Sequence, residues 1–158
     1  MATAGRRLTD TDYRIIDTTQ TQLEQIEKIE QQCFSCPWTL DQLRSQLSDD
    51  RHVFLAAVDA GGTVLGYVGM MFVLDEGYIS NVAVAPAYRR QGVADALIAA
   101  LMRRAEELAL AFVTLEVRAG NEPAKSLYAK HGFVPVGRRK NYYDLPKEDA
   151  ILMTRFWK

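Results

Sequence analysis

The chain holds a carboxylate and a phenol whose spacing suits proton transfer. Glu116 falls near the end of a predicted strand, and Tyr128 follows twelve residues later on the next predicted helix. A strand end and the helix after it can direct both side chains into one cleft, where a carboxylate can accept a proton and a phenol can donate one. A strand glutamate is also commonly an ion-pair partner, and a helical tyrosine commonly packs half-buried, so spacing alone leaves both interpretations open.

A second group of residues favours the binding of an anion. A predicted strand over residues 79–84 leads through a short connection into residues 89–94, which begin a predicted helix. Small residues at Gly92 and Ala94 let a phosphate approach the N–H groups of the first turn, where the helix dipole favours negative charge. The pattern is neither a Walker loop nor a Rossmann fingerprint, so nucleotide hydrolysis and hydride transfer lose support. The alternative is a solvated arginine pair that caps an ordinary surface helix.

Two short helices are expected near the N-terminus. Thr21 and Glu24 have the spacing of a capping box and predict a helix that ends near Cys33. Thr39 and Gln42 repeat that spacing beyond a proline and predict the second helix.

Apolar periodicity defines the remaining elements. Alternating and β-branched residues predict strands over residues 13–16, 52–58, 64–74, 77–84, 112–117, 133–139 and 150–156. Apolar residues three and four positions apart predict a long helix over residues 93–108. Asn121 is the expected N-cap of a further helix, and Gly132 has the position of its left-handed C-terminal residue. This order indicates an α+β or α/β fold, with a mixed sheet covered by helices on both faces.

Composition restricts the class of protein. We expect residues 1–158 to form a single domain, because 48% hydrophobic and 25% charged residues are typical of a globular chain of this length. A net charge of −1 supplies no positive field for nucleic acid. The longest uncharged run has fifteen residues and contains four glycines, which is too short to span a bilayer. No signal peptide is visible at the N-terminus, so we expect a cytoplasmic protein without a membrane partner.

The cysteines and histidines predict neither redox nor metal chemistry. Cys33 and Cys36 have C-x-x-C spacing, but Cys33 falls at a helix end rather than at the helix N-terminus that lowers a thiol pKa. Two cysteines are too few for a four-cysteine zinc site. His52 and His131 lack the neighbours of a catalytic triad or a metal site.

Taken together, these patterns resemble the GNAT superfamily of N-acetyltransferases. Arg89-x-x-Gly92-x-Ala94 is similar to the family signature Gln/Arg-x-x-Gly-x-Gly/Ala and follows the expected strand. Similar segments cover nearly the whole chain, at residues 37–38, 75–76, 116–121, 127–128, 132–133, 139–143 and 148–150. Within the family, the chain most resembles the RimI-type ribosomal-protein alanine N-acetyltransferases. The resemblance implies a mixed, mostly antiparallel seven-stranded sheet flanked by about four helices.

The resemblance also implies that acetyl-CoA is the acetyl donor and that no metal takes part. Main-chain amides of Val82 and Val84 would pair with the pantetheine arm and the acetyl group, and Asn121 would contact the cofactor further along. The cofactor-binding residues implied in this way are Val82, Ala83, Val84, Arg89, Arg90, Gln91, Gly92, Val93, Ala94, Asp95 and Asn121. Ala94 stands where many relatives have glycine, and Asp95 places a negative charge close to the phosphates.

Within this family pattern, Glu116 is the expected general base and Tyr128 the expected general acid. An attacking α-amino group has a pKa of about 7.7–8.0, so a carboxylate that acts directly or through water suffices to deprotonate it. A phenol within reach of the departing CoA sulfur can protonate it. Transfer would then be direct, within a ternary complex.

RimI-type resemblance implies that the acceptor is an N-terminal alanine, that of a small-subunit ribosomal protein. Trp38, Tyr142 and Tyr143 could wall the groove for this peptide, although ordinary aromatic packing would also account for them. Acidic Asp75 and Glu76 could attract a basic peptide, although exposed acids are common in turns.

Two other functions remain open. The same fold could acetylate a lysine side chain, a polyamine or a small-molecule amine, and a lysine amine of pKa about 10.4 would need stronger deprotonation. A non-catalytic acetyl-CoA-binding regulatory module would keep the fold but use Glu116 and Tyr128 for packing. Cofactor binding without turnover of any amine would identify that module.

Overall fold

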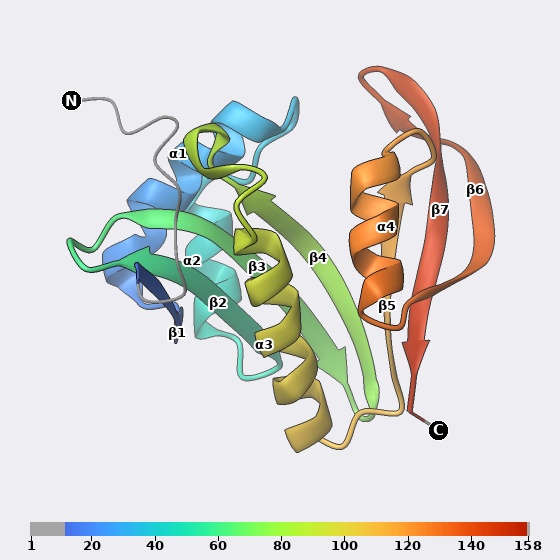
Figure 1. The fold of residues 1–158 in the computed structure, drawn as a ribbon, viewed down its shortest axis with the longest axis horizontal. Helices are drawn as coiled ribbons and strands as arrows, with labels where there is room; N and C mark the ends of the chain where they lie inside the picture. Colours follow the sequence, from blue (N-terminus) through green and yellow to red (C-terminus); the bar gives the residue numbers. More distant parts are fainter. Residues whose placement is uncertain (1–11, 158) are drawn as a thin grey trace.

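The computed structural model describes residues 12–157, which fold into a single sheet with helices on both sides (Figure 1). The expected absence of a signal peptide concerns residues outside this range. The strands are β1 (Tyr13–Asp17), β2 (His52–Asp59), β3 (Val64–Val73), β4 (Glu76–Val84), β5 (Phe112–Arg118), β6 (Val134–Asp144) and β7 (Lys147–Phe156). The helices are α1 (Leu23–Cys33), α2 (Leu40–Ser48), α3 (Val93–Glu107) and α4 (Glu122–Lys130).

The seven strands lie in the order β1-β2-β3-β4-β5-β7-β6. All neighbours in the described sheet are antiparallel except β4 and β5. Parallel neighbours need a crossover, and α3 provides it between β4 and β5. The predicted mixed, mostly antiparallel seven-stranded sheet is confirmed. The last two strands are longer than their apolar patterns predicted, because their polar ends pair with each other as a hairpin.

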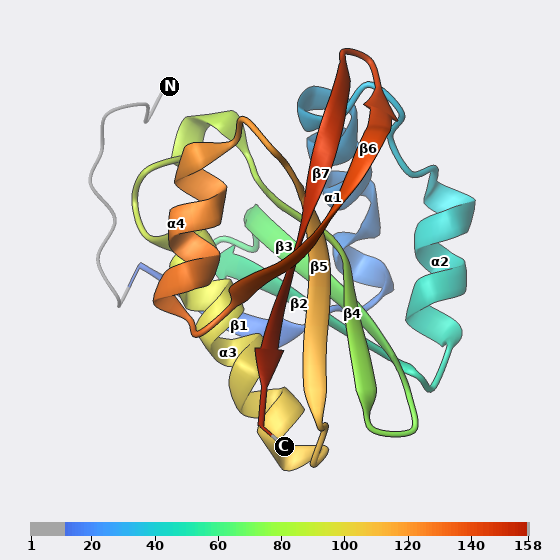
Figure 2. The same ribbon diagram turned by 90° about the vertical axis from the view of Figure 1, so that its right-hand side faces the viewer.

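Two apolar layers cover the sheet, as Figure 2 shows with α3 and α4 on one side and α1 and α2 on the other. The continuous apolar run of β2 supplies both layers, because successive side chains of a strand point to opposite faces. Val53 and Leu55 pack in the layer with Leu97 of α3. Phe54 packs in the layer with Ile26 of α1.

Helix capping agrees with the sequence at three of the four expected positions. Thr39 and Gln42 form the predicted capping box, the Asn121 side chain accepts from the N–H of Ala124, and Gly132 is left-handed at φ 87°. The capping box predicted at Thr21 and Glu24 is wrong. Thr19 and Gln22 make it instead, because a short 3-10 turn at Gln20–Gln22 precedes α1.

The feature that positions the site is the divergence of β4 and β5. Their pairing covers three positions and ends with Tyr78 opposite Thr114. Beyond that point the two strands run apart, as the upper half of Figure 1 shows. In the pairing of β3 with β4, Gly69 faces Asn81 and Met70 faces Ile79, which leaves Ser80 as an extra residue. Such a bulge bends a strand, and this one lies where β4 leaves β5.

Within residues 12–157, no helix combines the length and apolar character needed to cross a membrane.

Candidate active site

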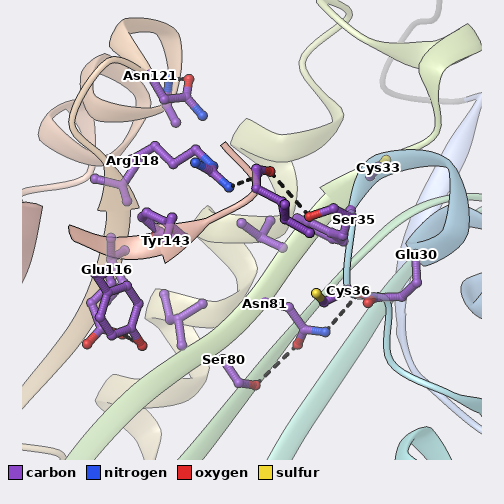
Figure 3. A pocket seen from close by; sticks show the side chains of 18 of the residues that line it. Glu30, Cys33, Ser35, Cys36, Ser80, Asn81, Glu116, Arg118, Asn121 and Tyr143 are labelled. Carbon is purple, nitrogen blue, oxygen red and sulfur yellow. Dashed lines mark hydrogen bonds between the residues drawn. The ribbon is translucent and has the colours of Figure 1, made fainter. Parts of the chain in front are cut away.

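A cavity of about 680 Å³ opens between the diverging strands (Figure 3). Residues 79–82 of β4 and residues 115–118 of β5 form two of its walls. The start of α4 contributes a third wall, and the end of α1 with the following loop contributes a fourth. The hairpin tip, which we define as residues 142–146 and which comprises the end of β6 and the turn that leads to β7, closes the remaining side. Five segments that are far apart in the sequence therefore meet around one space.

Glu116 points into this cavity and has three hydrogen-bond donors. Its side chain is only 9% exposed. Tyr78 and Tyr142 donate their hydroxyls to Oε1, the latter at 3.3 Å, and Arg139 donates Nε to Oε2 at 3.0 Å. Burial and the adjacent Glu116 carboxylate raise the pKa of the Tyr78 phenol, which therefore remains a donor at neutral pH. The carboxylate is fixed in orientation by these contacts from β4 and β6.

Tyr128 of α4 lines the same cavity from a buried position. Its ring packs against Phe133, with centroids 5.9 Å apart. Burial raises the pKa of its phenol, with a smaller contribution from Tyr143. The hydroxyl therefore carries its proton at neutral pH, which is the state that a proton donor requires.

Tyr142 and Tyr143 form an aromatic pair at the hairpin tip and both line the cavity. Their rings meet edge to face at 5.1 Å and 87°. Burial and Glu116 raise the pKa of Tyr143 to about 12. The guanidinium carbon of Arg118 lies 4.3 Å from the Tyr143 ring centroid. The Tyr143 hydroxyl is therefore a protonated donor at neutral pH, as a groove that binds peptide backbone needs.

The floor of the cavity contains a buried carboxylate, Glu30 of α1. Its Oε1 accepts from the Trp38 N–H at 2.8 Å, and its Oε2 accepts from the Asn81 amide at 3.0 Å. Burial raises the pKa of Glu30, and these two bonds oppose that rise. Glu30 thereby ties the loop that carries Trp38 to β4.

At the free edge of β4, alternate main-chain groups point toward the cavity and away from β3. The N–H of Ala85 donates to Leu65 on β3 at 2.8 Å. Since main-chain groups alternate along a strand, those of Val84 and Val82 point away from β3. In agreement, the Val84 carbonyl accepts from Arg89 Nε at 3.3 Å, outside the sheet. The arrangement leaves these amides on the edge where the sequence predicts that the cofactor binds.

The connection from β4 to α3 has the geometry of an anion site. Arg90 and Gly92 are left-handed, at φ 62° and 82°. Turns that include left-handed residues can gather N–H groups into an anion-binding concavity. A Cβ built on Gly92 would meet nothing within 4 Å, so open space lies before the first turn of α3. The residues present therefore fit a diphosphate.

Asp95, an acidic residue in that first turn, contacts one lysine and one histidine. His131 Nε2 lies 2.8 Å from its Oδ1, and Lys130 Nζ lies 3.1 Å from the same oxygen. Although burial opposes the shift, these two partners hold the pKa of Asp95 below its usual value. The end of α4 thus offsets a negative charge beside the phosphate site.

The structure brings together only part of the predicted set. The predicted residues that line the cavity are Trp38, Val82, Glu116, Asn121, Tyr128, Tyr142 and Tyr143. The Ala83 side chain is buried in the apolar layer that packs against α1 and α2, and it does not line the cavity. Val84 is the last residue of β4, and the other predicted cofactor residues lie in the connection to α3 and its first turn.

Glu76 lies at the other end of β4, opposite Phe112 at the start of β5. It does not line the cavity, so the geometry gives no support to a substrate contact by Glu76. Six residues of extended strand separate it from Val82, roughly 20 Å at 3.3 Å per residue.

Three polar residues that the sequence did not single out complete the site, namely Tyr78, Arg118 and Arg139. Arg118 lies two residues after Glu116, so strand alternation alone could have placed it on the same face. Tyr78 is paired with Thr114, which shares that face, but the pairing of β4 with β5 is needed to find it. Arg139 could be identified only from the arrangement of the hairpin formed by β6 and β7.

Neither cysteine chemistry nor a metal centre gains support. Cys33 Sγ lies 3.1 Å from Arg89 Nη2 and 3.6 Å from the Val84 carbonyl oxygen. Both Cys33 and Cys36 are free thiols, and α1 ends at Cys33 rather than beginning there. Among residues 12–157, no three histidine, cysteine or acidic side chains gather closely enough to hold a metal ion.

Comparisons with known proteins agree with this geometry. A family model described as the acetyltransferase (GNAT) family matches residues 23–133. The ribosomal protein bS18-alanine N-acetyltransferase of Escherichia coli (strain K12) is 35% identical over 135 residues, which cover 84% of this chain and 90% of that protein. The relative of the same name from Haemophilus influenzae is 33% identical over 133 residues, covering 82% and 89%.

A solved structure extends the similarity to the fold. The crystal structure of the ribosomal-protein-S18-alanine N-acetyltransferase from Escherichia coli superposes with a TM-score of 0.84 at 33% identity. The superposition covers 91% of this chain and 93% of that one. The chain belongs to the acetyltransferase (GNAT) family.

Proposed function

We propose that this protein is an N-alpha-acetyltransferase that transfers an acetyl group from acetyl-CoA to the N-terminal alanine of a protein, with a small-subunit ribosomal protein as acceptor. The observation that carries the proposal is that Glu116 and Tyr128 line one cavity beside the free edge of β4. The similar proteins named above support the choice of acceptor. We further propose that the chain works as one domain and acts in the cytoplasm, where ribosomal proteins are made.

In this proposal the connection between β4 and α3 holds the diphosphate, and Val82 and Val84 hold the pantetheine arm by their main chain. Bound acetyl-CoA supplies a thioester carbonyl and a sulfur leaving group. The chain's own task is to orient an uncharged amine against that carbonyl and to exchange two protons.

Glu116 accepts the proton of the α-ammonium, directly or through a water molecule. Tyr78 and Tyr142 donate to Oε1 and Arg139 to Oε2, so the carboxylate is presented to the cavity in one orientation. Tyr128 donates its proton to the departing sulfur and is reprotonated before the next cycle. No covalent bond to the enzyme is formed in this scheme.

The acceptor enters between the hairpin tip and the loop after α1. Tyr142 and Tyr143 line one side of this entrance, and Trp38 lines the other. Glu30 holds the main chain of Trp38 to β4, which fixes the Trp38 side of the entrance. An aromatic-walled entrance suits an unbranched chain end.

The test measures thiol release from acetyl-CoA with two peptides of the same sequence. One begins with a free alanine, and the other is N-terminally blocked and carries an internal lysine. Release with the free alanine only would support the proposal. Release with the blocked peptide only would assign the reaction to lysine side chains. Binding of acetyl-CoA without release of thiol, whether with either peptide or with polyamines, would favour the regulatory module.

A further inference from the structure

The hairpin tip forms a wall of the cavity but is itself exposed. Leu145, in the turn, is 63% exposed, and it lines the cavity together with Asp144 and Pro146. Across the entrance, Ser35 Oγ donates to the Leu145 carbonyl at 3.4 Å, which is a long hydrogen bond. An exposed turn needs a stronger anchor if the tyrosines beside it are to keep one position.

Arg118, the last residue of β5, supplies such an anchor (Figure 3). Its Nη1 donates to the Pro146 carbonyl at 2.8 Å, and its Nη2 donates to the Leu145 carbonyl at 3.3 Å. The guanidinium carbon of the same side chain lies over the Tyr143 ring, 4.3 Å from its centroid. One side chain therefore holds two consecutive carbonyls of the turn and one aromatic wall of the cavity.

Glu148 of β7 fixes the orientation of this guanidinium. Its Oε1 accepts from Arg118 Nη1 at 3.3 Å, and its Oε2 accepts from the Gly120 N–H at 2.6 Å. The carboxylate thus joins Arg118 to the turn that begins α4. A guanidinium can donate from two nitrogens to both carbonyls while its carbon lies over a ring, and the single ammonium of lysine cannot reproduce this set of contacts.

We propose that Arg118 is a positioning residue for the acceptor peptide. It fixes the hairpin tip, and through the tip it fixes the tyrosine pair that faces the peptide. It acts through Tyr142 and Tyr143, because its contacts are with the turn of the hairpin, with Glu148 and with the Tyr143 ring. Because the peptide is assumed to enter beside this hairpin, the inference rests on the proposed function.

The chain offers a closely matched control in Arg155 of β7. Arg155 donates to the His131 carbonyl at 3.0 Å and to Glu106 at 3.4 Å, and it lies 4.6 Å from the Trp157 ring centroid. The side chains of Arg118 and Arg155 are 29% and 27% exposed. Both arginines therefore donate hydrogen bonds to a main-chain carbonyl and to a glutamate and lie over an aromatic ring, but only Arg118 does so at the cavity.

The experiment compares Arg118→Lys with Arg155→Lys in the intact protein. We expect the KM for an alanine-starting peptide to rise about tenfold in Arg118→Lys alone, because the tyrosine wall loses its fixed position. The KM for acetyl-CoA should stay within about twofold of wild type in both variants. Mass-spectrometric hydrogen exchange should be faster over residues 140–148 in Arg118→Lys only.

The inference would be overturned if the KM for the peptide were the same in Arg118→Lys and Arg155→Lys. It would also be overturned if Arg118→Lys raised the KM for the peptide and the KM for acetyl-CoA by the same factor. Failure of the proposed function would be recognised separately, because the wild-type protein would then show no activity with the alanine-starting peptide. In that case the hydrogen-exchange comparison still decides whether Arg118 holds the hairpin tip, and the KM comparison is made with the amine that wild type accepts.

Discussion

Arg139 of β6 forms an ion pair with Glu116 of β5, with 3.0 Å between Nε and Oε2, although β7 lies between the two strands. An irregularity of the hairpin allows this reach. Arg139 is paired with Ala150 and Tyr143 with Glu148, so three residues of β6 face the single residue Asp149 of β7. The extra residues bend β6 over β7. The hairpin therefore brings both a cation and the Tyr142 hydroxyl to the proposed base.

Replacement of Glu116 by glutamine should test the base while keeping the shape of the side chain. We expect turnover to fall about 10²-fold, because an amide cannot accept the proton of the amine. The loss should be greatest below the amine's pKa and should shrink above it. Steady-state rates across pH would measure this. Glu107→Gln, at a carboxylate whose side chain is 72% exposed and paired with Arg104, is the control. A pH-independent loss would argue against Glu116 as base.

The substitution Tyr128→Phe removes one hydroxyl and leaves the ring. We expect turnover to fall about 10²-fold, because the departing sulfur loses its proton donor. The Tm should change little, since the ring contact with Phe133 is retained. Turnover and thermal unfolding of the same preparation would check both statements. Wild-type turnover in the variant would remove Tyr128 from the catalytic scheme.

Asp95→Asn should improve the binding of acetyl-CoA. The change removes a negative charge from the first turn of α3 and frees Lys130 from its ion pair. We expect the KM for acetyl-CoA to fall about two- to fivefold at low salt, with a smaller effect at high salt because charges are screened. The peptide KM should not change. A weaker affinity for acetyl-CoA would show that Asp95 serves the cofactor rather than opposing it.

The acid sensitivity of the hairpin should depend on Asp149. The N–H of Asn141 and the guanidinium of Arg138 hold the pKa of this carboxyl below its usual value. A lowered folded-state pKa stabilises the fold above the unfolded value of about 3.9, and that contribution is lost as the pH falls through the folded-state pKa.

Asp149→Asn should therefore lower the Tm by about 1–2 °C at pH 7, with the difference closing below about pH 4. Thermal unfolding of both proteins from pH 3 to pH 7 would measure it. A difference in Tm that is constant over this range would show that the ionisation of Asp149 does not contribute.

Local patterns in the sequence were enough to define most elements. The three- and four-residue periodicity predicted α3, and Thr39, Asn121 and Gly132 marked helix ends correctly, because caps and periodic faces involve neighbours within one or two turns. The error at Thr21 has the same origin. Two overlapping pairs have the spacing of a capping box there, Thr19 with Gln22 and Thr21 with Glu24. The first pair forms the box, because Thr19 is the N-cap of the 3-10 turn.

The resemblance to the acetyltransferase family named Glu116 and Tyr128 and most of the cofactor residues from the sequence itself. Tertiary structure decided which of these share a cavity. It separated Glu76 from the others because β4 is extended, and it placed the Ala83 side chain in the layer against α1 and α2 because successive side chains of a strand alternate between faces. It also added Tyr78, whose partner lies 38 residues away along the chain, Arg118, whose partners lie 27 and 28 residues away, and Arg139, whose partner lies 23 residues away. Such contacts depend on strand pairing and on the bend of a hairpin, which no local spacing encodes.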